Sequence, residues 1–152
     1  MTDVLEETIP GTRAVVLSGP TFAGEVALGL PTAITLAAKD SNDASYVAKI
    51  IGGAQFRTYV SDDPIGAQVA GATKNVLAIA CGIAEGKSLG QNAIAAIITR
   101  GIAEIGRLTT ALGGSEESMM ELAGVGDVVL TCTSSQSRNF SFGCHVGREQ
   151  TP

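Results

Sequence analysis

The chain has 152 residues, with 10 Lys and Arg against 15 Asp and Glu, and its formal net charge is −5. Hydrophobic residues make up 45% and charged residues 16%, which argues against a disordered chain, because disorder needs low hydrophobicity and high net charge. The acidic balance and the 4% of aromatic residues argue against a nucleic-acid partner, whether duplex or single-stranded. The length allows one domain or parts of two.

The cysteines and the N-terminal residues indicate in which cellular compartment the protein is found. Cys81, Cys132 and Cys144 are odd in number, far apart in the sequence and without a CxxC pair, so neither a disulfide framework nor a metal site is expected. The first seven residues are acidic, unlike the basic start of a signal peptide. The longest apolar run, residues 76–84, has about half the length of a bilayer span. We therefore expect a cytoplasmic protein without membrane insertion.

Residues 1–62 alternate between short apolar runs and helical spacing, separated by Gly and Pro. Ser41 is a plausible N-cap, and Pro31 and Gly52-Gly53 end the two helical stretches. The predicted elements are strands at 14–17, 32–38 and 56–60 and helices at 22–30 and 41–51. This order predicts an α/β unit.

After residue 62 the chain becomes rich in Ala and Ile, with helical periodicity. Asp62 or Asp63 can cap a first long helix, which has Pro64 in its first turn. The apolar stripe of this helix comprises Ile65, Val69, Ala72, Val76, Ile79 and Ile83. A break at residues 86–90 precedes a second long helix over 94–112, in which Arg100, Glu104 and Arg107 can pair. Ser115 can cap a third helix that ends near Gly124. Because the chain has an α/β pattern before residue 62 and a helical pattern after it, we place a domain boundary near residue 62.

Successive residues of a helix are about 100° apart around its axis, which places Lys74 about 180° from that apolar stripe. Its sector of the helix carries no charged residue one turn away. The neighbours there are Leu77 and the small residues Ala67, Ala70, Gly71, Ala78 and Cys81. A face in water normally carries several charges, so the pattern favours a lysine in a cleft over a surface lysine. Such an amine can act as a general base or bind an anion. Asn75 could orient a substrate hydroxyl or simply satisfy backbone groups.

Two later segments also carry chemistry. Gly124-Val125-Gly126-Asp127 combines glycines that permit close backbone approach with a carboxylate that is either a site residue or a helix N-cap. A run of hydroxyls and amides over residues 131–139 then contains one arginine, Arg138. A guanidinium beside Ser and Asn suits a phosphate, although an ordinary polar loop is the simpler interpretation of this pattern alone.

Five segments taken together resemble one family. In chain order they are Val16-Leu17-Ser18-Gly19-Pro20-Thr21-Phe22-Ala23, Gly71-Ala72-Thr73-Lys74-Asn75-Val76, Ile98-Thr99-Arg100-Gly101, Ala123 to Thr133 (AGVGDVVLTCT), and Ser137-Arg138-Asn139. Their order and spacing are similar to those of the bacterial NAD(P)-dependent glycerol-3-phosphate dehydrogenases, over essentially the whole chain. The resemblance implies a mixed, mainly α fold. Residues 1–62 would be the C-terminal part of a Rossmann-type dinucleotide-binding domain. Residues 63–152 would be an all-α substrate domain like the C-terminal domain of 6-phosphogluconate dehydrogenase, truncated at its C-terminus.

The resemblance also implies roles for single residues. Lys74 matches the family's catalytic lysine, which takes the proton of the C2 hydroxyl of sn-glycerol 3-phosphate. Ala23 matches a position at the nicotinamide cofactor, and Arg138 would lie close to both phosphate and cofactor. The positions that match the substrate-binding set are Gly19, Thr21, Lys74, Asp127, Ser137, Arg138 and Asn139, with Asn75 and Thr131 as additional contacts. The implied reaction interconverts sn-glycerol 3-phosphate and dihydroxyacetone phosphate with NAD(P)H, and supplies phospholipid synthesis.

One departure from the family is large. The G-x-G-x-x-G fingerprint that binds the cofactor pyrophosphate occurs nowhere in the chain. We therefore expect an internal piece of the enzyme that is inactive alone. Two alternatives stay open at this point. One is the helical domain of another 3-hydroxyacid dehydrogenase, and the other is a non-catalytic helical module that forms a homodimer through its small-residue face.

Overall fold

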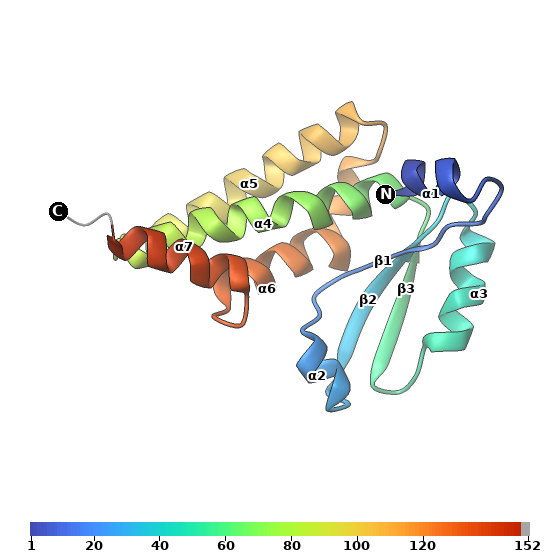
Figure 1. Ribbon diagram of the computed structural model, residues 1–152, viewed down its shortest axis with the longest axis horizontal. Coiled ribbons are helices and arrows are strands. Elements are labelled where there is room, and N and C mark those ends of the chain that lie inside the picture. Colours follow the sequence, from blue (N-terminus) through green and yellow to red (C-terminus); the bar gives the residue numbers. More distant parts are fainter. Residues whose placement is uncertain (150–152) are drawn as a thin grey trace.

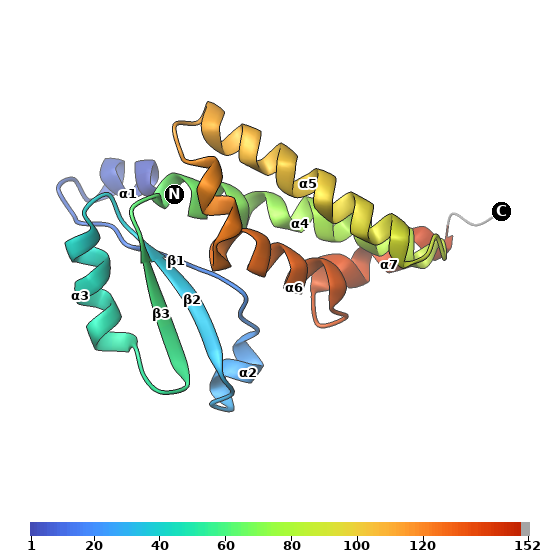
Figure 2. The same cartoon turned by 180° about the vertical axis from the view of Figure 1, so that it is seen from behind.

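The computed structural model describes residues 1–149, which form a small sheet with its helices at one end and a bundle of long helices at the other (Figures 1 and 2). The elements are Thr2–Thr8 (α1), Val16–Ser18 (β1), Ala23–Ala27 (α2), Thr32–Ala37 (β2), Ser41–Ile51 (α3), Phe56–Ser61 (β3), Pro64–Gly86 (α4), Gln91–Ala111 (α5), Glu116–Met120 (η1, a 3₁₀ helix), Leu122–Gly126 (η2), Asp127–Thr133 (α6) and Arg138–Glu149 (α7).

The sheet has the strand order β1-β2-β3. β1 is antiparallel to β2, with Val16 opposite Ala37, whereas β3 is parallel to β2 and is reached through the crossover helix α3. Alternate residues of β2 point to opposite faces. Ile34 and Leu36 are buried with α3, while Ala37 packs with Ala67 of α4. Both faces of β2 are therefore covered, which explains its almost unbroken apolar sequence.

Most elements of the α/β part lie where the sequence predicts them. The strands begin or end within two residues of the predicted bounds. The first helix is shorter than predicted, because α2 ends at Ala27 and Gly29 adopts a φ of +71° that no right-handed helix contains. Asp40 and not Ser41 caps α3, since its carboxylate accepts a hydrogen bond from the Asn42 amide. Helix α1 was not predicted.

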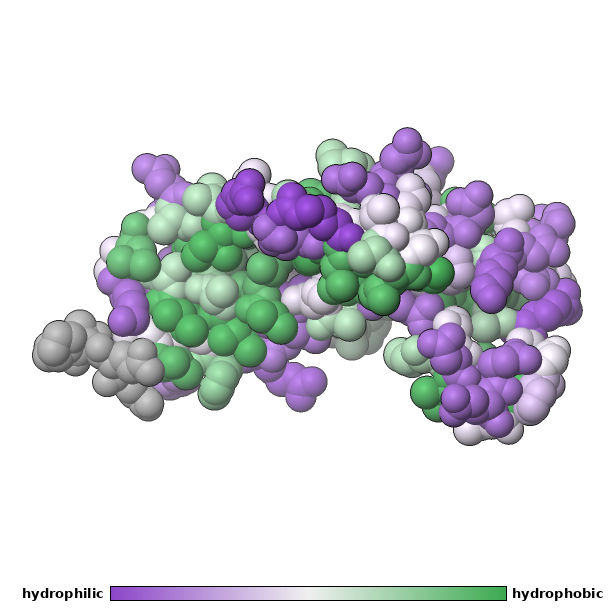
Figure 3. All heavy atoms as spheres, turned by 90° about the horizontal axis from the view of Figure 1, so that it is seen from above, coloured by the Kyte–Doolittle hydropathy of each residue, from purple (hydrophilic) through white to green (hydrophobic). Residues whose placement is uncertain are grey.

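Helix α4 is the central element of the bundle, contacted by α5, α6 and α7. Its predicted apolar stripe is only partly buried: Val69 lies in the core, whereas Val76 is 68% exposed. The side of α4 with Ala67, Ala70, Ala78 and Cys81 is buried. Small side chains let neighbouring helices approach closely, so this face is packed within the chain and is not free for the homodimer considered above. Seen from above, the helical part presents a broad apolar surface to solvent (Figure 3).

The contact between α4 and α7 depends on glycines in both helices. Gly82 and Gly86 on α4 meet Gly143 and Gly147 on α7 at a spacing of four residues. A Cβ on Gly82 would overlap the carbonyl oxygen of Phe140, and a Cβ on Gly143 would overlap that of Ile79. The two backbones are thus in direct contact, a packing that only glycine permits at these positions.

Asp63 joins the start of α4 to the loop before η1. Its Oδ1 accepts from the Gly66 amide at 2.9 Å and its Oδ2 from the Ser115 amide at 2.8 Å. Ser115 caps a helix as predicted, but that helix is the five-residue η1 and does not continue to Gly124. At Gly124 the backbone leaves helical geometry (φ −90°, ψ −105°), and this kink separates η1 from α6. The predicted pairing of Arg100 and Arg107 with Glu104 is confirmed on α5.

By length and composition alone, α4 is the one helix among residues 1–149 that could cross a membrane. Lys74 lies near its midpoint, and 39% of its most apolar window is buried inside the chain. The same features are those of a core helix surrounded by other helices.

Replacing Gly82 by Ala tests the close contact of α4 with α7. We expect the Gly82→Ala variant to lose about 1–3 kcal/mol of unfolding free energy, because its Cβ has no space beside the α7 backbone. Gly24→Ala is the matched control, since a Cβ there meets nothing within 4 Å, and it should be neutral or slightly stabilising. Urea unfolding measures both. Equal stabilities would show that the contact is not tight.

Asp63 should make stability depend on pH. Although burial alone raises its pKa, hydrogen bonds from the Gly66, Ser115 and Ile65 amides and from Ser118 outweigh this and lower it below 3.8. A lowered pKa in the folded state stabilises the fold above the unfolded value, and this stabilisation is lost as the pH falls through the folded value. Wild type should therefore exceed Asp63→Asn in unfolding free energy at about pH 6, and the difference should shrink towards about pH 3. A difference independent of pH would contradict this.

Candidate active site

Lys74 and Asp127 form an ion pair between α4 and α6. Lys74 Nζ lies 2.5 Å from Asp127 Oδ2, and the side chains are 23% and 5% exposed. The hydroxyl of Thr131, one turn further along α6, donates to Asp127 Oδ1 at 3.3 Å. The lysine side chain therefore remains partly exposed to solvent, while its carboxylate partner is held from both sides. Lys74 has no charged neighbour one turn away on α4, and its ionic partner is Asp127, 53 positions later in the sequence.

The kink between η1 and α6 places Asp127 for this contact. A Cβ on Gly124 would overlap the backbone of Met119, so the chain can turn here only with glycine. α6 begins directly after this turn, with Asp127 as its first residue rather than its N-cap. A carboxylate in the first turn of a helix is favoured by the helix dipole. The sequence thus fixes both the position and the direction of the carboxylate.

Burial raises the pKa of Asp127 above its ordinary value of 3.8. The hydrogen bond and the charge of Lys74, and the hydrogen bond from Thr131, act in the opposite direction and offset only part of this. The ammonium group of Lys74 therefore stabilises the charged form of this buried carboxylate.

A cavity of about 1000 Å³ opens in front of the pair. Its lining includes Ser18 at the end of β1, Gly19 and Thr21 just after it, and Gly71, Lys74 and Asp127, together with residues of α1. Gly19 has a φ of +152°, and a Cβ there would lie 3.0 Å from the Ile34 backbone. At Gly71 a Cβ would make an ordinary van der Waals contact with Ser18 Oγ at 3.7 Å. The glycines thus let the chain pass closely while leaving room beside the lysine.

The remaining predicted residues lie around the start of α7. Asn139 Nδ2 donates to Asn75 Oδ1 at 2.8 Å, which ties α7 to the residue after Lys74. Buried Ser137 accepts from the Phe140 amide. Arg138 is exposed and makes no hydrogen bond or ion pair within residues 1–149. Ser137, Arg138 and Asn139 do not line the cavity in front of Lys74.

Helix α2 approaches the same polar loop. Gln136 Nε2 donates to Glu25 Oε1 at 3.1 Å, and Ala23 lies exposed at the start of α2. The structure therefore brings Gly19, Thr21, Lys74 and Asp127 to one cavity, adds Thr131 behind the carboxylate, and leaves Ala23 and Arg138 on neighbouring exposed segments. Sequence reasoning missed the cavity residues of α1, and Gln68, which accepts a hydrogen bond from the Thr2 amide; no motif marks them.

Within residues 1–149 no three His, Cys, Asp or Glu side chains gather where they could hold a metal ion. For a nicotinamide cofactor the fit is partial. Gly19 and Gly71 leave room at the lysine, and the Arg138 guanidinium is available for an anionic group. The glycine-rich turn that would hold the pyrophosphate is not in this sequence. The chain can therefore supply only the side of the site at the reacting end of such a cofactor.

Comparison with known proteins gives a consistent result. Residues 63–152 match the family described as NAD-dependent glycerol-3-phosphate dehydrogenase C-terminus, and residues 1–44 match its N-terminus counterpart. The chain is 55% identical to a glycerol-3-phosphate dehydrogenase [NAD(P)+] of Caulobacter vibrioides over 99% of its own length and 46% of the relative. The chain is 56% identical to a glycerol-3-phosphate dehydrogenase [NAD(P)+] of Sphingopyxis alaskensis, over 96% of this chain and 44% of that relative. The chain thus spans about half the length of the curated relatives it matches.

Two solved structures extend the comparison. The glycerol-3-phosphate dehydrogenase of Coxiella burnetii is similar with a TM-score of 0.93 at 46% identity, over 97% of this chain and 45% of that one. The glycerol-3-phosphate dehydrogenase of Saccharomyces cerevisiae is similar with a TM-score of 0.88 at 30% identity, over 99% of this chain and 45% of that one. The fold is thus that of a Rossmann-type domain followed by a helical domain. The 152-residue chain belongs to the NAD-dependent glycerol-3-phosphate dehydrogenase family.

Proposed function

We propose that the protein of which this chain is a part interconverts sn-glycerol 3-phosphate and dihydroxyacetone phosphate with NAD(P)H. The observation that carries the proposal is the ion pair of Lys74 with Asp127 in a cavity lined by Gly19 and Thr21. An amine held by a buried carboxylate at the wall of a cavity is suited to exchanging a proton with a bound hydroxyl. The family membership supports the same chemistry.

Lys74 exchanges the proton at the C2 oxygen of the substrate. In the direction of alcohol oxidation, the amine accepts the hydroxyl proton while C2 loses a hydride. In the direction of ketone reduction, the ammonium returns this proton to the carbonyl oxygen. The nicotinamide cofactor, when bound, takes or supplies the hydride. The ion pair corresponds to the ammonium form of Lys74, which is the form needed for ketone reduction.

Asp127 positions the amine, and because it also lines the cavity we propose it as a substrate contact as well. Its Oδ2 holds Nζ and its Oδ1 is held by Thr131, so the direction of the lysine side chain is fixed by two contacts. When the amine gives up its proton, the carboxylate loses its ionic partner in a buried place. This cost favours return of a proton to Lys74 at the end of each turnover.

The phosphate of the substrate needs a cation, which Arg138 supplies in this proposal. Its guanidinium is exposed and unpaired within the described residues, and it follows the N-cap Ser137 of α7. A helix N-terminus and a guanidinium both favour a phosphate group. We further propose that Asn75, Thr131 and Asn139 contact the substrate and that Ala23 contacts the cofactor. The proposal also includes a cytoplasmic, homodimeric protein that supplies phospholipid synthesis.

Substitution of Lys74 tests the proposal in the longer parent protein. With dihydroxyacetone phosphate and NADPH, we expect Lys74→Ala to lower kcat by about 10²–10⁴-fold, because the proton donor is removed. Lys87→Ala is the matched control, since Lys87 is exposed just after α4 and far from the cavity lining. Unchanged turnover in Lys74→Ala, with the fold verified by circular dichroism, would rule out the proposed role of Lys74.

A further inference from the structure

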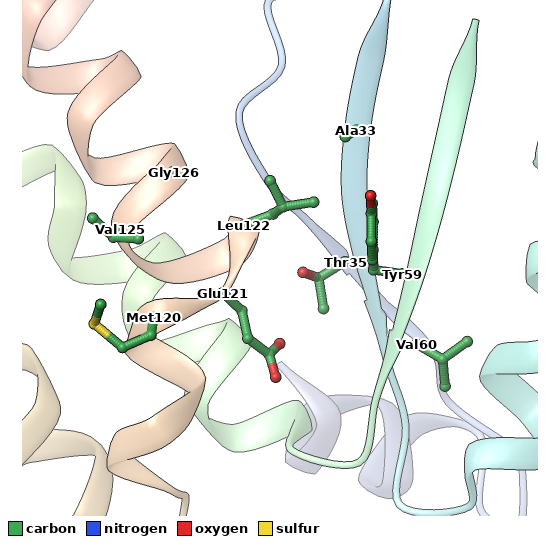
Figure 4. A pocket seen from close by; sticks show the side chains of 9 residues that line it. All are labelled: Ala33, Thr35, Tyr59, Val60, Met120, Glu121, Leu122, Val125 and Gly126. Carbon is green, nitrogen blue, oxygen red and sulfur yellow. The ribbon is translucent and has the colours of Figure 1, made fainter. Parts of the chain in front are cut away.

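A second hollow lies on the other side of the η2 segment. It has a volume of about 440 Å³ and separates the β2–β3 face of the sheet from η1 and η2 (Figure 4). Gly126 lines it, whereas the next residue, Asp127, lines the cavity in front of Lys74. The two hollows share no lining residue, so the second is not part of the proposed active site.

Thr35 has an unusual environment at the base of this hollow. It is 1% exposed, and its Oγ1 has no hydrogen-bond partner among the described residues. In Figure 4 the hydroxyl points from β2 towards the η1–η2 segment. A buried hydroxyl without a partner is unfavourable, and nearly all buried polar groups in proteins are paired. The neighbouring position on the same face of β2 is Ala33, so a small side chain leaves space beside the hydroxyl.

Glu121 extends into the same space from the opposite wall (Figure 4). Its carboxylate accepts a hydrogen bond from Ser61 Oγ at 3.4 Å. Burial raises its pKa, and the nearby charges of Asp63 and Asp62 add to this. No lysine, arginine or histidine is among the described residues that line the hollow, and Arg57 on β3 lies over the Tyr59 ring at 5.7 Å from its centroid. The hollow therefore has an acid at one wall and the Thr35 hydroxyl at its base, with apolar sides that include Leu122 and Val125.

We propose that this hollow, between Thr35 and Glu121, binds a small organic amine whose ammonium group pairs with Glu121 and whose apolar body lies against Leu122 and Val125. The acidic wall excludes phosphate-bearing molecules, which separates this ligand class from the substrate and cofactor of the active site. The same ammonium group donates a hydrogen bond to the Thr35 hydroxyl oxygen, which satisfies that buried hydroxyl at the base of the hollow. The volume suits a molecule of about ten non-hydrogen atoms.

The test uses 2-phenylethylamine as the probe, with methyl NMR of the 152-residue chain. We expect saturable shifts of the Leu122 and Val125 methyl signals with a Kd of roughly 1–10 mM, as suits a ligand of this size. The anion phenylacetate should cause no saturable shifts, and the neutral 2-phenylethanol should bind at least about fivefold more weakly. Equal binding of all three probes, or no saturable binding of the amine, would overturn the proposal. This comparison needs only the wild-type chain.

Two variants then locate the contacts. Glu121→Gln should weaken amine binding by about tenfold, because it removes the charge, and Thr35→Val by about threefold or more. Glu117→Gln is the matched control: Glu117 is an exposed acid on the preceding 3₁₀ helix η1 that does not line the hollow, and this variant should bind like wild type. If Thr35→Val raises the melting temperature and leaves the Kd unchanged, the hydroxyl holds no ligand and the proposal is wrong. Unchanged binding in Glu121→Gln would also overturn it.

Discussion

The contact between the Lys74 ammonium and the Asp127 carboxylate joins the middle of α4 to the first residue of α6, and the arrangement around the cavity depends on it. Asp127 is almost fully buried, and burial raises its pKa even with the lysine beside it. Removing one partner from such a pair leaves the other charge uncompensated, which costs far more than the pair itself contributes. The ion pair is thus better explained by position and chemistry than by a gain in stability.

The rest of the helical part is built so that this contact can form. The glycine contacts of α4 with α7 bring Asn75 and Asn139 within hydrogen-bonding distance, next to Lys74. The kink at Gly124 turns the chain so that α6 starts with its carboxylate towards α4. Asp63 holds the loop before η1 against the start of α4. Backbone approach that only glycine permits therefore determines where the charged side chains lie.

The sequence was most informative where a single helix face carried the signal. The absence of charges around Lys74 predicted a cleft lysine, and the structure places Lys74 at a cavity wall. The large apolar residues of the same helix were less informative, because Val76 of the apolar stripe is exposed whereas Ala70 and Ala78 are buried. In close helix packing the small residues are the buried ones.

Contacts between distant segments could not be predicted from the residues alone. Asp127 was a candidate, but nothing in its neighbourhood shows that it meets Lys74 rather than capping a helix. The antiparallel direction of β1 is also invisible, since a buried strand has the same apolar pattern in either direction. Helix α1 has no buried residue and hence no periodicity to detect. The family resemblance supplied the site residues that periodicity could not.

The central claim is that Lys74 and Asp127 are energetically coupled, and a double-mutant cycle measures this directly. The unfolding free energies of wild type, Lys74→Met, Asp127→Asn and the double variant would be obtained from urea titrations near neutral pH. The account predicts a favourable coupling of about 1–3 kcal/mol, because each single variant leaves a buried polar group without its charged partner. Effects that add within about 0.5 kcal/mol would show two independent groups and contradict the account.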